Sequence, residues 1–384
     1  MEQIVTSEFK LGIISGGQLG KMIALAASNW DVKTYILDAD KNCSSSTICT
    51  SFTQGNPLSY DDVISFGKQV DMITFEVENV NIEALKDLKK QGLRIFPDPH
   101  TLEIIQDKGL QKQFYQKHNI QSSSFQLFDD IQSIHTALQE QKISYPFVQK
   151  LRKGGYDGKG VAVIRSENDL NLLLEGPSLI EDCVNIKKEL AVIAARNHSG
   201  EVKCFPIVEM EFNAQANLVD LLICPAQISE THAQRAVEIA TKLVESFEFC
   251  GVLAIEFFLD QNDELWVNEV APRPHNSGHH TIESVMTSQF EQLLRAIFNF
   301  PLGSTELKLP SAMINLLGEE NFSGPVKYIG LKESMEIDGV KIHLYGKQET
   351  KPFRKMGHIT ILAKTLEEAK QKATLVKQQF KVQA

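Results

Sequence analysis

The first hundred residues alternate short apolar runs with segments of helical periodicity. The runs typical of strands are 10–15, 33–38, 71–76 and 93–96, and the helical patterns are 18–28 and 82–91. This alternation predicts strand–helix–strand units and therefore a parallel sheet of the α/β class. The segment Pro97-Asp98-Pro99 ends this unit, because proline continues neither a sheet ladder nor a helix.

The rest of the chain mixes strands and helices less regularly, which is typical of α+β folds. The pattern predicts helices near 102–118, 232–247, 287–298 and from 366 onward, a hairpin between 147 and 164, and strands near 313–317, 341–345 and 358–363. A chain of 384 residues exceeds what one hydrophobic core usually supports. We expect three units, at 1–101, at 102–302 with a flexible glycine-rich loop near 146–165, and at 303–384.

Composition narrows the class of protein. A net charge of −10 argues against a nucleic-acid partner, which normally requires a basic face, but a local cluster of lysines and arginines can still bind phosphate. Six cysteines without C-x-x-C spacing favour reduced thiols. No signal-peptide pattern occurs, and no apolar run reaches the about 18 residues of a membrane span. The sequence therefore predicts a soluble cytoplasmic protein without a membrane partner.

A glycine turn, Gly16-Gly17-Gln18-Leu19-Gly20, lies between the first predicted strand and helix. Helix N–H groups at such a turn can receive a phosphate. Asp38 at the end of the next strand invites a nicotinamide-dinucleotide interpretation, but the G-x-G-x-x-G order is absent. A phosphate or ribose-phosphate contact is favoured, and a purely packing role for the glycines remains open.

A second glycine-rich segment, 154–160, has four glycines among seven residues. Its backbone amides could approach phosphate oxygens closely, and Lys150, Lys153 and Lys159 add positive charge. The alternative is a flexible surface hairpin. The aromatic ring and the carboxylate of Tyr156-Asp157 at the tip favour a loop that faces a substrate.

Two glutamates are expected to face each other on a hairpin. Residues 251–259 form a buried strand pattern that only Glu256 interrupts, and 265–270 form the returning strand. With Asn262 and Asp263 as the two central turn residues, Glu256 lies opposite Glu269 on one face. Like charges in that arrangement are destabilising, and a divalent cation such as Mg²⁺ removes the penalty. If the register slips, the two are separate surface glutamates.

A polar loop follows Glu269. Three histidines within it, His275, His279 and His280, suggest zinc at first, but the prolines and Gly278 prevent the helical spacing that would aim them at one ion. Arg273, His275 and Asn276 are therefore predicted to recognise a substrate.

These motifs in combination resemble the ATP-grasp superfamily and, within it, the 5-(carboxyamino)imidazole ribonucleotide synthases. The motifs that carry the resemblance are 16–20, 76–80 (EVENV), 106–108 (QDK), 155–160 (GYDGKG) and the long, specific segment 268–279 (NEVAPRPHNSGH). The resemblance implies an ATP-grasp fold over 102–302, preceded by a Rossmann-like lobe and followed by a small lobe that completes the substrate site.

The resemblance also implies residue roles. ATP would be bound by Lys108, Lys150, the loop Gly155, Tyr156, Asp157, Gly158, Lys159, Gly160 and Val161, the adenine-side strand Glu181, Asp182, Cys183 and Val184, and by Glu189, Asn268 and Glu269. The nucleotide substrate would be bound by Gln18, Glu76, Tyr156, Asp157, Arg273, His275, Asn276, Lys347 and Arg354. Catalytic roles would fall to Asp157, Tyr156, Lys347, Arg273 and His275, and the metal ligands would be Glu256 and Glu269. Two departures are Phe212, where a histidine is frequent, and Lys108, where an arginine is common.

The implied activity is the ATP- and bicarbonate-dependent carboxylation of the amine of 5-aminoimidazole ribonucleotide in purine biosynthesis. Its cofactors would be ATP and Mg²⁺, with Mn²⁺ as an alternative ion, and the chain would form a homodimer. Another ATP-grasp ligase, such as a formate-dependent glycinamide ribonucleotide transformylase, is the nearest alternative. A nicotinamide oxidoreductase and a catalytically silent nucleotide-binding protein are alternatives of other classes.

Overall fold

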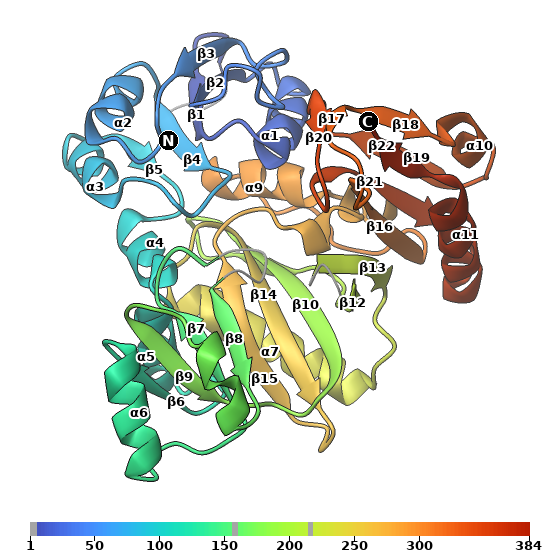
Figure 1. Ribbon diagram of the computed structural model, residues 1–384. Coiled ribbons are helices and arrows are strands. Elements are labelled where there is room, and N and C mark those ends of the chain that lie inside the picture. Colours follow the sequence, from blue (N-terminus) through green and yellow to red (C-terminus); the bar gives the residue numbers. More distant parts are fainter. Residues whose placement is uncertain (1–5, 156–159, 214–217) are drawn as a thin grey trace.

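The computed structural model describes residues 6–155, 160–213 and 218–384 (Figure 1). Its first unit is a parallel sheet, as the alternating pattern predicted, and the strand order is β3-β2-β1-β4-β5, which includes the unpredicted strand β3. The elements are β1 (Lys10–Ile14), α1 (Gln18–Ser28), β2 (Lys33–Asp38), β3 (Ser51–Gln54), α2 (Tyr60–Gly67), β4 (Met72–Phe75), α3 (Ile82–Lys90) and β5 (Arg94–Ile95). The central strands β1 and β4 are almost wholly buried, because helices cover both faces of a parallel sheet.

The helix predicted over 102–118 is instead two helices, α4 (Pro99–Gln106) and α5 (Lys108–Lys117). Asp107 breaks it, because its carboxylate accepts the backbone N–H groups of Gly109 and Leu110 and so caps α5. Arg152 holds the same carboxylate through two hydrogen bonds of 2.9 and 2.8 Å. The break places Lys108 at the first turn of α5, where it points toward the site described below.

A four-stranded antiparallel sheet, β6-β9-β7-β8, follows. Its elements are β6 (Phe125–Phe128), α6 (Ile131–Gln139), β7 (Phe147–Leu151), β8 (Val161–Ile164), the 3-10 helix η1 (Glu167–Leu172) and β9 (Ser178–Asp182). Strands β7 and β8 form the predicted hairpin. Of its glycine-rich tip, Tyr156, Asp157, Gly158 and Lys159 lie outside the described residues, so their predicted roles stay predictions.

The central sheet has the order β15-β14-β10-β12-β13-β16-β21-β19, with β11 beside β10. Its elements up to the hairpin are β10 (Ile186–Arg196), β11 (Val202–Cys204), β12 (Val208–Asn213), β13 (Leu218–Cys224), α7 (Glu230–Ser246), β14 (Gly251–Asp260) and β15 (Leu265–Ala271). Helix α7 packs its buried face on β10 and β14. The Phe114 ring of α5 stacks on Phe247 at 3.8 Å between ring centroids and joins α5 to this core.

The C-terminal unit extends that same sheet, because β16 pairs with β13. The remaining elements are η2 (Asn276–Gly278), α8 (Thr281–Ser284), α9 (Gln289–Ile297), β16 (Ser311–Leu317), β17 (Gly324–Pro325), β18 (Lys327–Ile329), α10 (Leu331–Met335), β19 (Val340–Leu344), β20 (Glu349–Thr350), β21 (Lys355–Leu362), α11 (Leu366–Gln379) and β22 (Lys381–Gln383). The sequence indicated a separate small unit at 303–384, but it did not show that its strands continue the central sheet.

Helix α9 lies where the units meet (Figure 1). Its apolar side chains share one core with α1, β1, β10 and β14. Because these elements come from both the first unit and the central sheet, α9 packs against both and joins them. In the described part of the chain, no helix combines the length and apolar character that crossing a bilayer requires.

Candidate active site

The turn between β14 and β15 differs from the predicted one. It contains three residues, 261–263, and Asp263 adopts a left-handed conformation with φ of 65°. The carboxylate of Asp260 accepts the backbone N–H groups of Asn262 and Glu264 and closes this longer turn. The predicted two-residue turn at Asn262 and Asp263 is therefore wrong.

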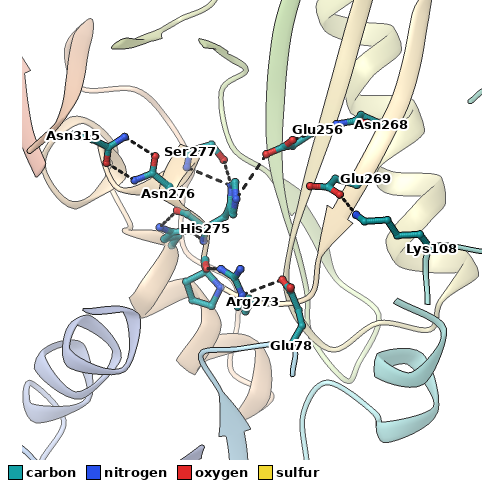
Figure 2. Close-up of polar contacts among 12 residues, drawn as sticks. Glu78, Lys108, Glu256, Asn268, Glu269, Arg273, His275, Asn276, Ser277 and Asn315 are labelled. Carbon is teal, nitrogen blue, oxygen red and sulfur yellow. Dashed lines mark hydrogen bonds and ion pairs between the residues drawn. The ribbon is translucent and has the colours of Figure 1, made fainter. Parts of the chain in front are cut away.

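A β-bulge nevertheless brings Glu256 and Glu269 together. Between two paired positions, β14 has only Glu256, whereas β15 has both Asn268 and Glu269. Regular strand residues alternate between faces, but the bulge turns Asn268 and Glu269 toward the same open face. The two carboxylates lie side by side there (Figure 2). The predicted facing exists, although its cause is the bulge rather than a regular register.

The two carboxylates have different electrostatic environments. Lys108 forms an ion pair with Glu269 and holds the pKa of that carboxyl well below its usual range. Burial, together with the charge of Glu269, raises the pKa of Glu256. The Glu256 and Glu269 side chains are 19% and 40% exposed, so a cation can reach them from solvent. A divalent cation beside Glu256 would supply the positive charge that this carboxylate lacks.

These donors fit a magnesium ion that arrives with phosphate. A protein usually contributes one or two carboxylates to such an ion, while phosphate oxygens and water complete its shell. Among residues 6–155, 160–213 and 218–384, no three His, Cys, Asp or Glu side chains form a group that could hold a metal ion. The carboxylate pair therefore suits Mg²⁺ bound to a nucleotide, and a zinc site at the histidine-rich loop is not supported in the described part.

A buried ion triad lies next to this pair. The carboxylate of Glu181 bridges the ammonium groups of Lys112 and Lys150 at 2.5 and 2.7 Å, and Lys150 also donates to Asn268 at 2.8 Å. Burial alone would favour the neutral acid, but the two lysines hold the pKa of Glu181 below its ordinary value. Glu181 thus fixes Lys150 with its side chain, whereas the resemblance implied only a place on the adenine-side strand. Asp182 ends β9, and Cys183 beyond it is exposed.

Glu189 on β10 is half-buried, and its charge adds to the rise in the pKa of Glu256. Burial raises the pKa of Glu189 itself to about 7. In the ligand-free protein this carboxylate is therefore charged at a cost in stability above that pH. Hydroxyl groups of a bound sugar would relieve the cost by donating to it, and the predicted contact of Glu189 with ATP stays a prediction.

This environment predicts a pH-dependent gain from Glu189→Gln. The folded pKa of about 7 exceeds the ordinary 4.5, so wild-type stability falls as pH rises through that window. The variant lacks this loss, and its ligand-free melting temperature should exceed that of wild type at about pH 8 and approach it at about pH 5. Glu211→Gln, at an exposed position on β12, is the control. An equal difference at both pH values for Glu189→Gln would contradict the prediction.

Strand β15 continues into the loop that carries Arg273, His275 and Asn276 (Figure 2). Arg273 Nε lies 3.0 Å from Glu78 of the first unit, and His275 Nε2 lies 3.7 Å from Glu256 Oε1. The second contact brings His275 to the edge of the carboxylate pair, and the first ties Arg273 to the first unit.

The Asn276 side chain is committed elsewhere. Its amide exchanges two hydrogen bonds with the amide of Asn315, at 2.8 and 3.1 Å, and Asn315 also donates to the carbonyl of Val219. The side chain that was predicted to contact substrate therefore holds the loop against β16. The strand pattern at 313–317 did not indicate that Asn315 would be the partner of Asn276.

The amides of the first glycine turn are occupied by protein carboxylates. Glu76 accepts the N–H groups of Gly17, at 2.7 Å, and of Gly20, while Asp38 accepts that of Gly16 at 2.7 Å. Burial raises the pKa of Glu76 despite these hydrogen bonds. The three amides are thus engaged within the protein, and Asp38 closes the turn instead of facing a dinucleotide ribose. Gln18 is the first residue of α1, where the helical pattern placed it.

Lys347 and Arg354 lie in the C-terminal unit. Lys347 Nζ donates to the carbonyl of Lys355, and Arg354 donates to the carbonyl of Glu349, both at 2.7 Å. The turn that carries Lys347 approaches the first unit, because Lys21 of α1 donates to the carbonyl of Leu344. Their predicted contacts with substrate stay predictions.

Sequence reasoning assigned no site role to Glu78 or Lys112. Glu78 lies inside the motif 76–80, and Lys112 is one helical turn after Lys108. Their positions in the sequence therefore indicated that both lie near predicted site residues. Phe212, the position that departs from the resemblance, is half-buried on β12 and packs with Val208 and Met210. An apolar side chain at this position is accommodated by the core.

Three family models match successive parts of the chain. They describe a ribonucleotide synthetase preATP-grasp domain at residues 9–106, an ATP-grasp domain at 113–290 and a phosphoribosylaminoimidazole carboxylase C-terminal domain at 311–372. All three agree with the order of units in the fold.

Curated relatives match over almost the whole chain. The N5-carboxyaminoimidazole ribonucleotide synthase of Bacillus subtilis is 35% identical over 97% of this chain and 96% of its own length. The chloroplastic phosphoribosylaminoimidazole carboxylase of Vigna aconitifolia is 37% identical over 94% of this chain. The chain spans 65% of that relative and 66% of the Candida albicans phosphoribosylaminoimidazole carboxylase.

Solved structures match equally far. The N5-carboxyaminoimidazole ribonucleotide synthetase of Thermotoga maritima has a TM-score of 0.90 and 43% identity and covers 98% of this chain and 99% of its own. The Aspergillus clavatus synthase in complex with ADP and 5-aminoimidazole ribonucleotide has a TM-score of 0.88 and 31% identity, with coverages of 97% and 98%. With this fold, these matched domains and these relatives, the chain belongs to the N5-carboxyaminoimidazole ribonucleotide synthase family of ATP-grasp enzymes.

Proposed function

We propose that this chain uses ATP and bicarbonate to carboxylate the amine of 5-aminoimidazole ribonucleotide, giving 5-(carboxyamino)imidazole ribonucleotide for purine biosynthesis. The observation that carries the proposal is the course of β15. This strand holds Glu269 beside Lys108 and then continues into Arg273 and His275. Residues suited to binding phosphate and residues suited to binding an anionic nucleotide therefore belong to one site.

The phosphate end of the site combines carboxylates with lysines. When bound there by Glu256 and Glu269, Mg²⁺, or Mn²⁺ as an alternative ion, would neutralise charge on the phosphates of ATP. Lys150 is held by Glu181 and Asn268, which fixes its ammonium group at the edge of the carboxylate pair. Lys108 and Lys150 would stabilise the γ-phosphoryl group as a bicarbonate oxygen attacks it, so that carboxyphosphate forms and ADP leaves.

The nucleotide end receives that reactive species. Arg273 can offer a planar fork to an anionic group, and His275 lies between this arginine and Glu256. As the substrate amine takes up the carboxyl carbon and inorganic phosphate leaves, Asp157 would accept the amine proton and Tyr156 would act with it. The loop near 146–165 would exclude water. Lys347 and Arg354 would bind a further anionic part of the substrate from the C-terminal unit.

The similarity to the Aspergillus clavatus synthase, which was solved with ADP and 5-aminoimidazole ribonucleotide, supports this choice of substrates. A homodimer is proposed from the family resemblance alone. A cytoplasmic location is proposed because all six cysteines are free thiols, as a reducing compartment requires.

ADP release with each component omitted in turn tests the proposed function. The full mixture of MgATP, bicarbonate and 5-aminoimidazole ribonucleotide should release ADP, and omission of the ribonucleotide or of bicarbonate should reduce the rate at least about 10-fold. Release that depends on formate and glycinamide ribonucleotide would instead assign the chain to the transformylase alternative. Tight NADH binding without ADP release would favour the oxidoreductase.

A further inference from the structure

A buried glutamine on α9 holds the backbone of His275. Gln289 is 0% exposed. Its Oε1 accepts the N–H of His275 at 2.9 Å, and its Nε2 donates to the carbonyl of the same residue at 2.8 Å. The Nε2 group also lies 3.2 Å from Nδ1 of His279. A carboxamide can accept from an N–H and donate to a carbonyl at once, which neither a carboxylate nor an apolar side chain of this length does.

The Gln289 amide lies directly against the loop backbone at Gly278. A Cβ on Gly278 would lie 2.4 Å from Gln289 Oε1 and 2.6 Å from its Cδ. Position 278 therefore needs a glycine because the loop backbone closes directly over the amide.

Gln289 is attached to a rigid element. It is the first residue of α9, whose Ser288 cap accepts the N–H of Glu291, and its own N–H donates to Thr281 at 2.9 Å. The apolar face of α9 is buried in the core that joins the first unit to the central sheet. The His275 backbone is thus held by a helix that is packed in the core shared by the first unit and the central sheet.

We propose that Gln289 is a positioning residue, which sets the loop backbone so that the His275 imidazole lies between Glu256 and Arg273. This inference rests on the proposed function, because that function gives His275 its task at the nucleotide end of the site. His275 Nδ1 bonds Ser277 at 2.9 Å and its Nε2 faces Glu256, so a shift of its backbone moves the ring away from the carboxylate pair.

The same helix offers a matched control. Gln292 is also 0% exposed, accepts the N–H of Gly303 at 2.8 Å and donates to the carbonyl of Gly303 at 3.1 Å. Gln292 forms the same pair of hydrogen bonds to one backbone residue as Gln289 does, but that residue lies outside the site. Gln289→Met and Gln292→Met each leave one backbone N–H and one carbonyl without these partners, so similar falls in melting temperature are expected.

The experiment compares these two variants in the full-length protein. Gln289→Met should lower kcat/KM for 5-aminoimidazole ribonucleotide about 100-fold and leave the Kd for MgATP within about twofold of wild type. Gln292→Met should keep kcat/KM within about threefold. Equal losses in both variants, or a stable Gln289→Met with wild-type kcat/KM, would overturn the proposal.

Two further measurements keep the result decisive. Gly278→Ala pushes a methyl group against the same amide and should reproduce the loss if Gln289→Met does not fold. The ring ¹⁵N chemical shifts of His275 should move in Gln289→Met and stay fixed in Gln292→Met. If wild type shows no ribonucleotide-dependent ADP release, the proposed function fails, and unchanged His275 shifts would separately overturn the positioning role.

Discussion

Glu269→Gln is expected to lower kcat for ADP release at least about 1,000-fold while the protein remains folded. The substitution keeps the shape of the side chain but removes the charge that pairs with Lys108. It also leaves the proposed Mg²⁺ with Glu256 as its only carboxylate, and burial still raises the pKa of that carboxyl. Coupled detection of ADP at saturating substrates measures the loss, and circular dichroism checks the fold.

Glu264→Gln is the matched control for that prediction. Glu264 lies on the same hairpin, directly before β15, and is exposed. It should retain wild-type turnover. A folded Glu269→Gln protein with full activity would remove the carboxylate pair from the mechanism, whatever the family resemblance.

Arg273→Lys should raise KM for 5-aminoimidazole ribonucleotide and lower kcat/KM about 100-fold, although the charge is conserved. Lysine lacks the planar fork of the guanidinium, so a two-point contact with an anionic group is lost. The ion pair with Glu78 also loses its geometry, which loosens the link between the loop and the first unit. Steady-state kinetics with varied ribonucleotide, and calorimetry with MgATP, separate the two ends of the site.

Arg295→Lys provides the comparison for Arg273→Lys. Arg295 lies on α9, pairs with Glu291 and donates to the carbonyl of Pro301, away from the site. Its replacement should leave both kinetic constants near wild type. Arg273→Lys could instead lose affinity for MgATP and for the ribonucleotide to a similar extent. That result would show that Arg273 does not belong to the end of the site that binds 5-aminoimidazole ribonucleotide.

Hydrophobic periodicity predicted most of the first unit, because buried parallel strands and their helices have strong, local patterns, but it missed β3 and α2. It failed at Asp107, where one side chain divides a continuous helical pattern. It also failed at the 261–263 turn, where the Asp260 carboxylate selects a longer loop. Both errors come from side-chain hydrogen bonds to the backbone, which periodicity does not register.

The sequence predicted only part of the candidate site, because the pattern of residue types does not show which side chains form hydrogen bonds with distant residues. Glu256 and Glu269 could be found because a charge interrupts an apolar strand. Gln289 and Asn315 could not, because their partners lie 14 and 39 residues away along the chain. The bulge at Asn268 and Glu269 was equally hidden, since a single inserted residue changes which face a side chain occupies without changing the pattern of residue types.

The continuity of the central sheet limits how this enzyme could be shortened or fused. Strand β13 is apolar along most of its length, and its outer hydrogen-bonding groups are covered by β16 of the C-terminal unit. A chain ending near 303 would expose β13 as an unprotected edge, which is a template for aggregation. The C-terminal unit therefore behaves as a structural part of the ATP-grasp core, and it could not be exchanged as an independent module without a new cover for that edge.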